Sequence, residues 1–223
     1  MSDFSEYVRR LVRLDSCALS DALDKLGLPG CVTGLAPLSS SSKIAGRVHT
    51  VKLVAKSVAP PPSGPPRHLG TTAIAAAEPG EIIVVEQKSR LDAGSWGGIL
   101  SMGAKMRGIA GVIADGPVRD VDEARQMDFP VYGRCPTAKT ARERVVEVGT
   151  DIPVSIGDVT VEAGDYALAD ASAVVFVRAG DIEQVLDAAE MIAGREAAMA
   201  KALMAGEPIT EVMGANYEHM LKG

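Results

Sequence analysis

The hydrophobic and polar positions of this chain follow two different spacings. Apolar residues recur every three to four positions near both ends and at several places between, which is typical of amphipathic helices, whereas β-branched runs predict strands. Helices are predicted over 4–14, 18–26, 70–77, 99–107 and 121–127, and over 182–203 with an extension near 212. Strands are predicted over 44–55, 81–86, 110–114, 129–132, 152–156, 159–161, 166–170 and 173–177.

The order of these elements predicts an α/β fold with a mixed sheet. Strands and helices alternate over 81–132, and this order requires crossover connections and therefore a parallel portion of sheet. Between 152 and 177 short strands follow one another across glycine-containing turns without a helix, which predicts a small β-layer. We expect one domain over 1–223, and we expect its long final helix to pack on a neighbouring protomer.

The helix expected over 99–107 begins beside a pair of glycines. We expect Ser95 to be its N-cap, and Gly97 and Gly98 to leave backbone N–H groups uncovered. Free N–H groups and the positive end of the helix dipole favour a bound carboxylate by about 0.3–2 kcal/mol. Glycine pairs at helix starts are common, so this feature alone is weak evidence for an anion site.

Arg119 and Asp120 follow the strand expected at 110–114, after a turn predicted at 115–117. Open α/β sheets bind ligands beyond the carboxyl ends of their strands, so a ligand is expected beside this pair. A guanidinium, a carboxylate and a helix N-terminus together suit a small oxo acid and a divalent cation. Two structural explanations stay open: Asp120 and Glu123 form a capping box for the next helix, and Arg119 makes only a surface ion pair.

Other polar residues are weaker candidates. Ser20 and Asp21 are interpreted as a polar helix face or a local cap, with a substrate contact as the alternative. Lys52 lies on a predicted strand and is expected to reach solvent, although a desolvated lysine can act as a Schiff-base amine. The proline-rich segment 59–67 predicts a stiff loop at the rim of the site, with a peptide ligand for a partner as the alternative. The histidines, which form no ligand cluster in sequence, are His49, His68 and His219.

Composition excludes several classes of function. The net charge is −6 and aromatic residues make up 4 % of the chain, so we expect no nucleic-acid partner. The three cysteines are widely spaced, which indicates neither a disulfide framework nor a zinc site, and favours a reducing compartment. The N-terminus is acidic and no apolar run approaches the length of a membrane span, so we expect a cytoplasmic protein without membrane contact.

The segment 96–134, WGGILSMGAKMRGIAGVIADGPVRDVDEARQMDFPVYGR, resembles the RraA-like family. That family includes metal-dependent 4-hydroxy-4-methyl-2-oxoglutarate / 4-carboxy-4-hydroxy-2-oxoadipate aldolases and regulators of ribonuclease E activity. The resemblance implies a swivelling β/β/α fold with a long C-terminal helix, assembled as a homotrimer or a dimer of trimers with sites between protomers. Further matching segments are 20–27, 44–46, 78–85, 164–170 and 195–198.

The same resemblance implies roles for individual residues. The cofactor would be Mg²⁺ or Mn²⁺, with Asp120 as its carboxylate ligand and Arg119 as the catalytic arginine that holds the oxygens of pyruvate. An acidic residue of a neighbouring protomer also approaches the metal in these aldolases, and Glu196 is its match. The substrate carboxylate would be received by the backbone of Gly97, Gly98, Ile99 and Leu100.

One position departs from the aldolase pattern. The aldolases carry an aspartate where this chain has Gly98, which is expected to weaken metal binding or alter substrate placement. The predicted function is cleavage of a 4-hydroxy-2-oxo acid to pyruvate, with oxaloacetate decarboxylation at the same site, and no general base is assigned. Two alternatives stay open: a non-catalytic regulator that binds a ribonuclease, and a lyase of this family for a different oxo or sugar acid.

Overall fold

The computed structural model describes residues 3–61 and 68–214. Most of the predicted proline-rich loop, 62–67, and His219 therefore lie outside the described residues. Among the residues described, no helix is long and apolar enough to cross a membrane.

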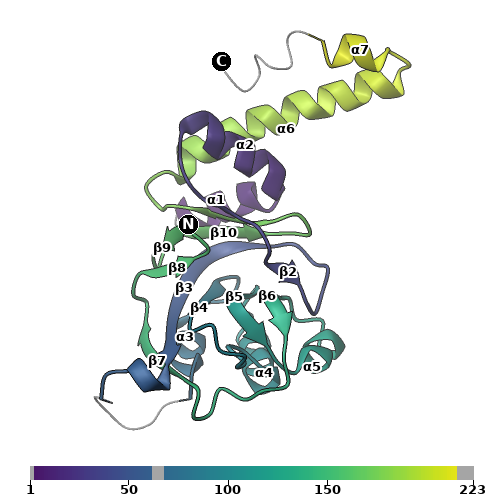
Figure 1. Ribbon diagram of the computed structural model, residues 1–223. Coiled ribbons are helices and arrows are strands. Elements are labelled where there is room, and N and C mark those ends of the chain that lie inside the picture. The colour runs from purple at the N-terminus through teal and green to yellow at the C-terminus, as the bar shows by residue number, and fades with distance from the viewer. Residues whose placement is uncertain (1–2, 62–67, 215–223) are drawn as a thin grey trace.

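A long strand, β3 (Ile44–Ala55), joins the two halves of the molecule (Figure 1). Its first half pairs antiparallel with β10 (Tyr166–Ala169) and its second half with β7 (Val145–Thr150), while β4 (Ile82–Gln87) runs parallel along its other side. The strand order of the sheet is β1-β11-β10-β3-β4-β5-β6-β2, with β7 beside β3. The other strands of this sheet are β1 (Cys31–Val32), β2 (Ala36–Pro37), β5 (Gly111–Val118), β6 (Val131–Pro136) and β11 (Val174–Val177), and a separate hairpin is formed by β8 (Val154–Ile156) and β9 (Val159–Val161).

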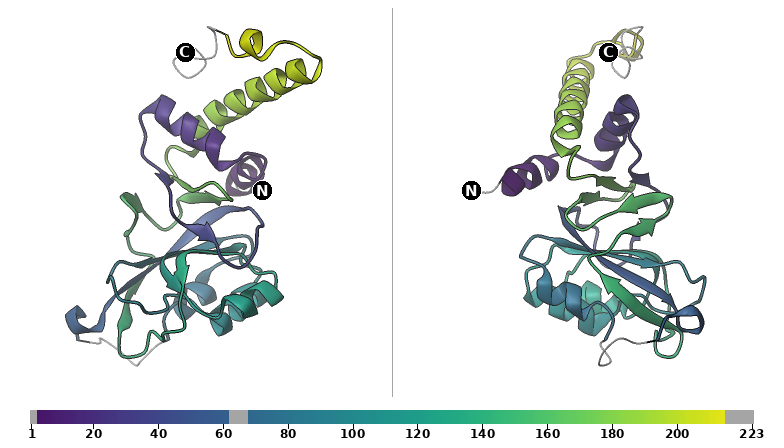
Figure 2. Two further views of the ribbon diagram at one scale, coloured as in Figure 1. Left: turned by 45° about the vertical axis from the view of Figure 1, so that its right-hand side comes forward. Right: turned by 90° about the vertical axis from the view of Figure 1, so that its left-hand side faces the viewer.

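The parallel part of the sheet carries the helices that position the candidate site. Strands β3, β4, β5 and β6 are parallel neighbours, and three helices cover one face of this part (Figures 1 and 2). Trp96 is buried in the core beneath them and donates from Nε1 to Ser101 Oγ at 3.0 Å. These helices are α3 (Thr71–Ala76), α4 (Gly98–Met106) and α5 (Val121–Gln126).

A second helical layer lies on the opposite side of the molecule. It consists of α1 (Asp3–Leu11), α2 (Ser16–Leu26) and α6 (Ile182–Met204), which pack around a core cluster that includes Leu19, Leu168 and Leu186. Beyond this cluster, the second half of α6 and the short α7 (Ile209–Val212) extend past the rest of the fold (Figure 2). The predicted α/β class, the mixed sheet and the long C-terminal helix are confirmed.

Several boundaries differ from the sequence prediction. The turn expected at 115–117 is wrong, because β5 continues to Val118 and absorbs the irregularity as a register shift between Ala114 and Pro117. Strand β7 was not predicted, because only Val145 of its residues is fully buried and its pattern of apolar residues is therefore weak. Strand β6 begins at Val131, two residues later than expected.

Candidate active site

The candidate site forms where the start of α4 meets the end of β5. The two segments are joined by backbone hydrogen bonds: Ser95 N donates to Pro117 O at 2.8 Å, and Arg119 N donates to Trp96 O at 3.0 Å. A β-bridge between Trp96 and Val118 extends this pairing. The predicted Arg119-Asp120 pair and the predicted glycine pair are therefore side by side.

The expected N-cap of α4 is wrong. The helix begins at Gly98, and Ser95 instead donates from Oγ to Pro117 O at 2.7 Å. The cap comes from Asp120, whose Oδ2 accepts from Gly98 N at 3.1 Å. This contact satisfies one of the first four N–H groups of α4, which have no partner within the helix. Gly98 N–H is thus occupied by the protein itself, which leaves the amides of Ile99 and Leu100 for a ligand.

The side-chain capping box expected for α5 is also absent. Asp120 occupies the N-cap position of α5 in a left-handed conformation with φ 57°, and its carboxylate makes no cap contact with that helix. The bonds at this helix start are made by the backbone instead: Glu123 N and Ala124 N donate to Asp120 O at 3.1 Å and 3.2 Å. A left-handed conformation at a residue other than glycine is uncommon and is enriched at functional sites. Here it turns the Asp120 carboxylate away from its own helix and toward α4.

Arg119 and Asp120 form a partly exposed ion pair. Arg119 Nε donates to Asp120 Oδ1 at 3.2 Å and to Oδ2 at 3.1 Å, and the two side chains are 36 % and 30 % exposed. With the described residues, the terminal NH₂ groups of Arg119 make no hydrogen bond. The ion pair with Asp120, which the sequence analysis gave as the structural explanation of Arg119, therefore uses only Nε. Most of the guanidinium's N–H donors are left available to an anion.

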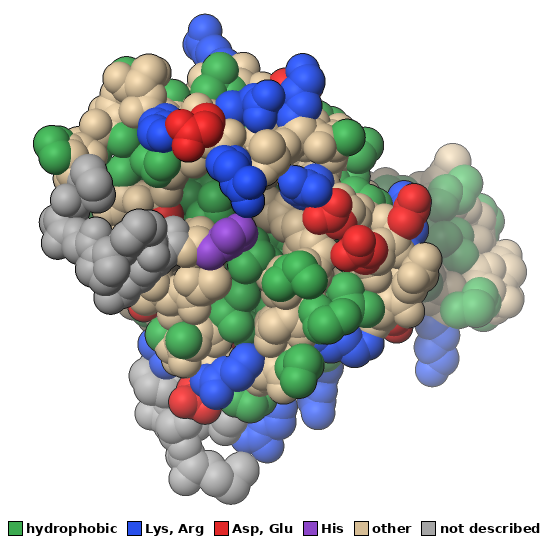
Figure 3. Space-filling view, turned by 90° about the horizontal axis from the view of Figure 1, so that it is seen from below, with side chains coloured by type: hydrophobic (Ala, Val, Ile, Leu, Met, Phe, Trp, Pro, Cys, Tyr) green, Lys and Arg blue, Asp and Glu red, His purple; other side chains and the backbone are tan. Residues whose placement is uncertain are grey.

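A cavity of about 570 Å³ lies beside this pair. It is lined by residues 119–123 and by residues 136–138. The segment that connects β6 to β7 carries three exposed basic residues, Lys139, Arg142 and Arg144. It is tied to the site by a backbone hydrogen bond, in which Gly94 N donates to Lys139 O at 2.9 Å. Lysine and arginine side chains also gather on the end of the molecule shown in Figure 3.

The donor atoms at the cavity suit a hard cation. Among the described residues there is no group of three or more histidine, cysteine, aspartate or glutamate side chains that could hold a metal ion. Three carboxylates, those of Asp120, Asp122 and Glu123, do line the cavity, and that of Asp122 is paired with Arg125. Magnesium keeps several waters and is commonly held by one or two carboxylates together with oxygens of the substrate. The residues present therefore fit Mg²⁺ or Mn²⁺ if substrate, water or a second protomer supplies the remaining oxygens.

Glu196 does not reach Asp120 within one chain. It lies on α6, whereas Asp120 precedes α5, and these helices are at opposite ends of the molecule (Figure 1). Burial, and then repulsion from Asp15 and Asp21, raises the pKa of the Glu196 carboxyl. Burial, together with repulsion from Asp24 and Asp15, likewise raises the pKa of Asp21. Approach of Glu196 to the site of a neighbouring protomer stays a prediction.

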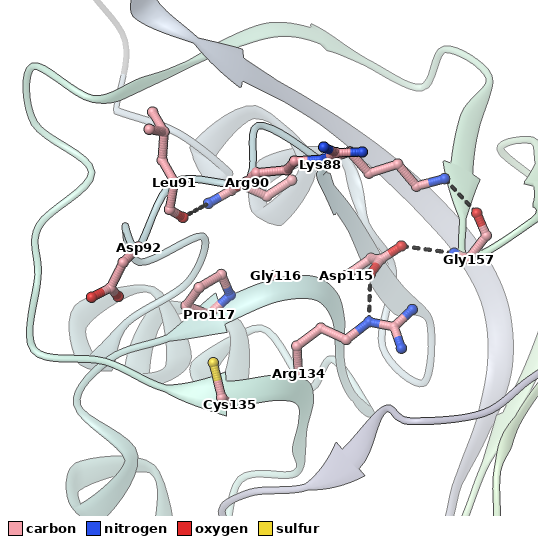
Figure 4. Close-up of a pocket in the computed structure, with 11 residues that line it drawn as sticks. Lys88, Arg90, Leu91, Asp92, Asp115, Gly116, Pro117, Arg134, Cys135 and Gly157 are labelled. Carbon is pink, nitrogen blue, oxygen red and sulfur yellow. Dashed lines mark hydrogen bonds and ion pairs between the residues drawn. The ribbon is translucent and has the colours of Figure 1, made fainter.

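A second, larger cavity of about 660 Å³ lies at the carboxyl ends of β4, β5 and β6 (Figure 4). Its wall includes Asp115, a buried carboxylate that accepts from Arg134 Nε at 2.7 Å and from Gly157 N at 2.7 Å. Lys88 also binds this wall, through Gly157 O. Since Asp115 is fully engaged by its neighbours, it ties β5 to β6 and to the β8–β9 hairpin, and the cavity's size alone assigns it no chemistry.

Two other polar candidates, Lys52 and His49, have structural partners. Lys52 Nζ lies 3.7 Å from Glu86 Oε2, which favours an ion pair over a Schiff-base role. His49 lies between two carboxylates, with Nδ1 2.9 Å from Asp151 Oδ1 and Nε2 2.8 Å from Glu81 Oε2. All three cysteines are free.

The fold and the site define an α/β protein that presents an Arg-Asp pair against a glycine-rich helix start, at the carboxyl end of an inner strand of a mixed sheet. The chain belongs to the RraA-like family: residues 16–176 match the family model described as Aldolase/RraA. The predicted family and its fold are thereby confirmed.

Individual relatives are similar at modest identity. The chain is 26 % identical to DlpA of Legionella pneumophila over 92 % of its own length but only 32 % of that protein's length. It is 28 % identical to the "Putative 4-hydroxy-4-methyl-2-oxoglutarate aldolase" of Halalkalibacterium halodurans over 83 % of this chain and 82 % of the relative. The crystal structure of an uncharacterized protein from Pseudomonas syringae pv. tomato superposes with a TM-score of 0.83 at 25 % identity, covering 94 % of this chain and 98 % of the other.

Proposed function

We propose that this chain is a divalent-metal-dependent lyase that cleaves a 4-hydroxy-2-oxo acid to pyruvate and also decarboxylates oxaloacetate. The observation that carries the proposal is the meeting of Arg119, Asp120 and the start of α4 beside one cavity. Membership in a family described as Aldolase/RraA and the printed name of the Halalkalibacterium relative support a lyase activity.

The protein's own groups would bind and orient the substrate. The terminal NH₂ groups of Arg119 donate to oxygens of the 2-oxo acid, and the free amides of Ile99 and Leu100 receive its carboxylate at the positive end of α4. Asp120 aligns these elements, because it holds both Gly98 N–H and Arg119 Nε. Positive charge placed where negative charge develops is among the largest contributions to catalysis.

The cation completes this arrangement chemically. Held by Asp120, Mg²⁺ or Mn²⁺ would supply the charge that stabilises the pyruvate enolate produced by either reaction. We include in the proposal a homotrimer or hexamer in which Glu196 of a neighbouring protomer approaches the cation. The exposed second half of α6, where Glu196 lies, supports such an association.

Two other functions stay open on the same scaffold. A structural neighbour from Streptomyces coelicolor, described as RraAS2, an unusual member of the RNase ES inhibitor RraA protein family, has a TM-score of 0.72 at 24 % identity over 82 % of this chain and 90 % of that one, which shows the fold alone. The fold therefore permits a non-catalytic regulator or a lyase for a different oxo or sugar acid. The Arg119-Asp120 pair at a cavity favours the lyase, because a regulator that acts by surface contact needs no such site.

Pyruvate release tests the proposal. Release of pyruvate from oxaloacetate and from 4-hydroxy-4-methyl-2-oxoglutarate would be measured for the wild-type protein with Mg²⁺ and again with a chelator. The same measurement with Mg²⁺ would then be made for the Asp120→Ala variant. We expect turnover with Mg²⁺ that the chelator abolishes and that Asp120→Ala reduces at least about a hundredfold. Metal-independent turnover, or an Asp120→Ala variant with wild-type rates, would refute the roles assigned to the cation and to Asp120.

A further inference from the structure

Gly98 leaves a space that another side chain fills. A Cβ atom placed on Gly98 would lie 2.8 Å from Glu123 Cδ and 3.1 Å from Asp120 Cβ, and it would overlap Glu123 Oε2. The Glu123 carboxyl group therefore occupies the position where a side chain at residue 98 would begin. It does so from α5, while Gly98 is the first residue of α4.

The position of Glu123 is set by packed structure. Its N–H bonds to Asp120 O at 3.1 Å, and the next residue, Ala124, is buried against the core cluster beneath α4 and α5. Lys105 of α4 binds Met127 O just after α5, which ties the two helices together at their other ends. Glu123 is thus carried to Gly98 by helix packing.

The Glu123 carboxylate has no partner of its own in the described part of the chain, where it makes no hydrogen bond and no ion pair. The neighbouring Asp122 differs, since its carboxylate is paired with Arg125 Nη1 at 2.9 Å and is 86 % exposed. Glu123 lines the same cavity as Arg119, Asp120 and Asp122, so three carboxylates and one guanidinium line it. Asp120 is paired with Arg119 and Asp122 with Arg125, which leaves the carboxylate of Glu123 as the one of the three without a basic partner. Like charges gathered at one site are costly unless a cation is bound between or beside them.

We propose that Glu123 is the second carboxylate that holds the divalent cation, acting with Asp120 from the space that Gly98 leaves open. This inference rests on the proposed function and adds to it: the acid at the site comes from position 123 because position 98 has no side chain. Oxygen donors from two carboxylates match what Mg²⁺ and Mn²⁺ require from a protein.

A carboxylate swap tests the assignment. Glu123→Gln removes the charge while keeping the shape, and Glu123→Ala removes the side chain and clears the space beside Gly98. Gly98→Asp combined with Glu123→Ala returns a carboxylate to that space from α4. Asp122→Asn is the matched control, because it removes a charge one residue away whose partner is Arg125. Circular dichroism and thermal unfolding of each variant verify that it is folded.

The primary measurement is Mn²⁺ affinity, obtained from the electron paramagnetic resonance signal of free Mn²⁺, and pyruvate release from oxaloacetate is the second. We expect Glu123→Gln and Glu123→Ala to weaken Mn²⁺ binding about tenfold or more, as is usual when a group that supports a metal is lost. The swap variant is expected to recover most of that loss, and Asp122→Asn to bind Mn²⁺ as the wild type does.

The outcomes separate this inference from the proposed function. Wild-type Mn²⁺ affinity in Glu123→Gln, together with its loss in Asp120→Ala, would overturn the role of Glu123 and leave the proposed function standing. Failure of the folded swap variant to recover any affinity would also overturn it, since a carboxylate in that space would then be without effect. A wild-type protein that binds no Mn²⁺ would overturn both.

Discussion

Replacing Gly97 by alanine tests whether the site depends on the close approach of α4 to the Arg119-Asp120 pair. A Cβ atom at position 97 would lie 2.9 Å from Asp120 Oδ2 and 3.1 Å from Arg119 Cγ. The backbone of Gly97 is extended, with φ −159°, so alanine adopts its conformation without strain and the effect is one of space alone.

The size of the effect follows from these distances. To reach ordinary contact distances the ion pair must move by roughly half an ångström, and overpacking of this kind typically costs about 1–3 kcal/mol. Part of that cost is offset by about 0.4–1 kcal/mol, because alanine restricts the unfolded chain more than glycine does. A misplacement of about 1 Å can reduce a rate about a hundredfold, so we expect kcat/KM for oxaloacetate to fall by about tenfold or more.

Gly103→Ala is the matched control. Gly103 lies on the same helix, and a Cβ atom there would meet only Ile74 Cγ2, at 4.0 Å. Alanine in a helix interior stabilises by about 0.5–1 kcal/mol relative to glycine, so this variant is expected to unfold at a slightly higher temperature with unchanged kcat/KM. If Gly97→Ala keeps wild-type kcat/KM with Mg²⁺, the close contact between Gly97 and the ion pair has no catalytic importance and the reasoning is refuted.

Two further predictions concern stability. Arg134→Met leaves buried Asp115 without its cation and should lower the free energy of unfolding, measured by urea titration, by about 3 kcal/mol. Arg125→Met is the control, because Arg125 pairs with the exposed Asp122, and it should cost under about 1 kcal/mol. Equal costs for the two variants would contradict the argument from burial. Although burial opposes it, hydrogen bonding from the Ser16 amide and hydroxyl and from other amides lowers the pKa of Asp170. A depressed pKa stabilises the fold above the unfolded-state value near 4, and the contribution is lost as pH falls through the folded-state pKa. Asp170→Asn should therefore flatten the loss of stability below about pH 4, and an unchanged pH slope would contradict this.

The sequence predicts the long, regular elements of the fold well. Helix α2 ends at Gly27 in a left-handed conformation, as predicted, whereas it begins at Ser16, two residues before the predicted start, because Asp15 caps it. Helix α6 follows its apolar spacing to within one residue of the predicted end. Strand β7 escapes prediction because an edge strand with mostly half-buried positions has little hydrophobic pattern to detect.

The candidate site shows why local patterns are insufficient at a functional centre. Ser95 and Asp120 are both of residue types that commonly cap the helix that follows them, but tertiary contacts give them other partners. Ser95 binds the end of β5, and Asp120 caps a helix that begins 22 residues earlier. Glu123 has the spacing of a capping box and yet its side chain lies beside Gly98. That contact joins two helices that pack side by side on one face of the sheet, and no spacing within one element encodes it.

Divalent-metal-dependent pyruvate release by Asp120→Asn tests the central claim most directly. Asparagine keeps the size of Asp120 and an oxygen that accepts from Gly98 N, so the start of α4 stays capped while the negative charge is removed. The account predicts a folded protein whose Mg²⁺-dependent release of pyruvate from oxaloacetate falls at least about a hundredfold. Wild-type rates in Asp120→Asn would show that the charge of this carboxylate is not needed, and would contradict the assignment of a cation-assisted lyase.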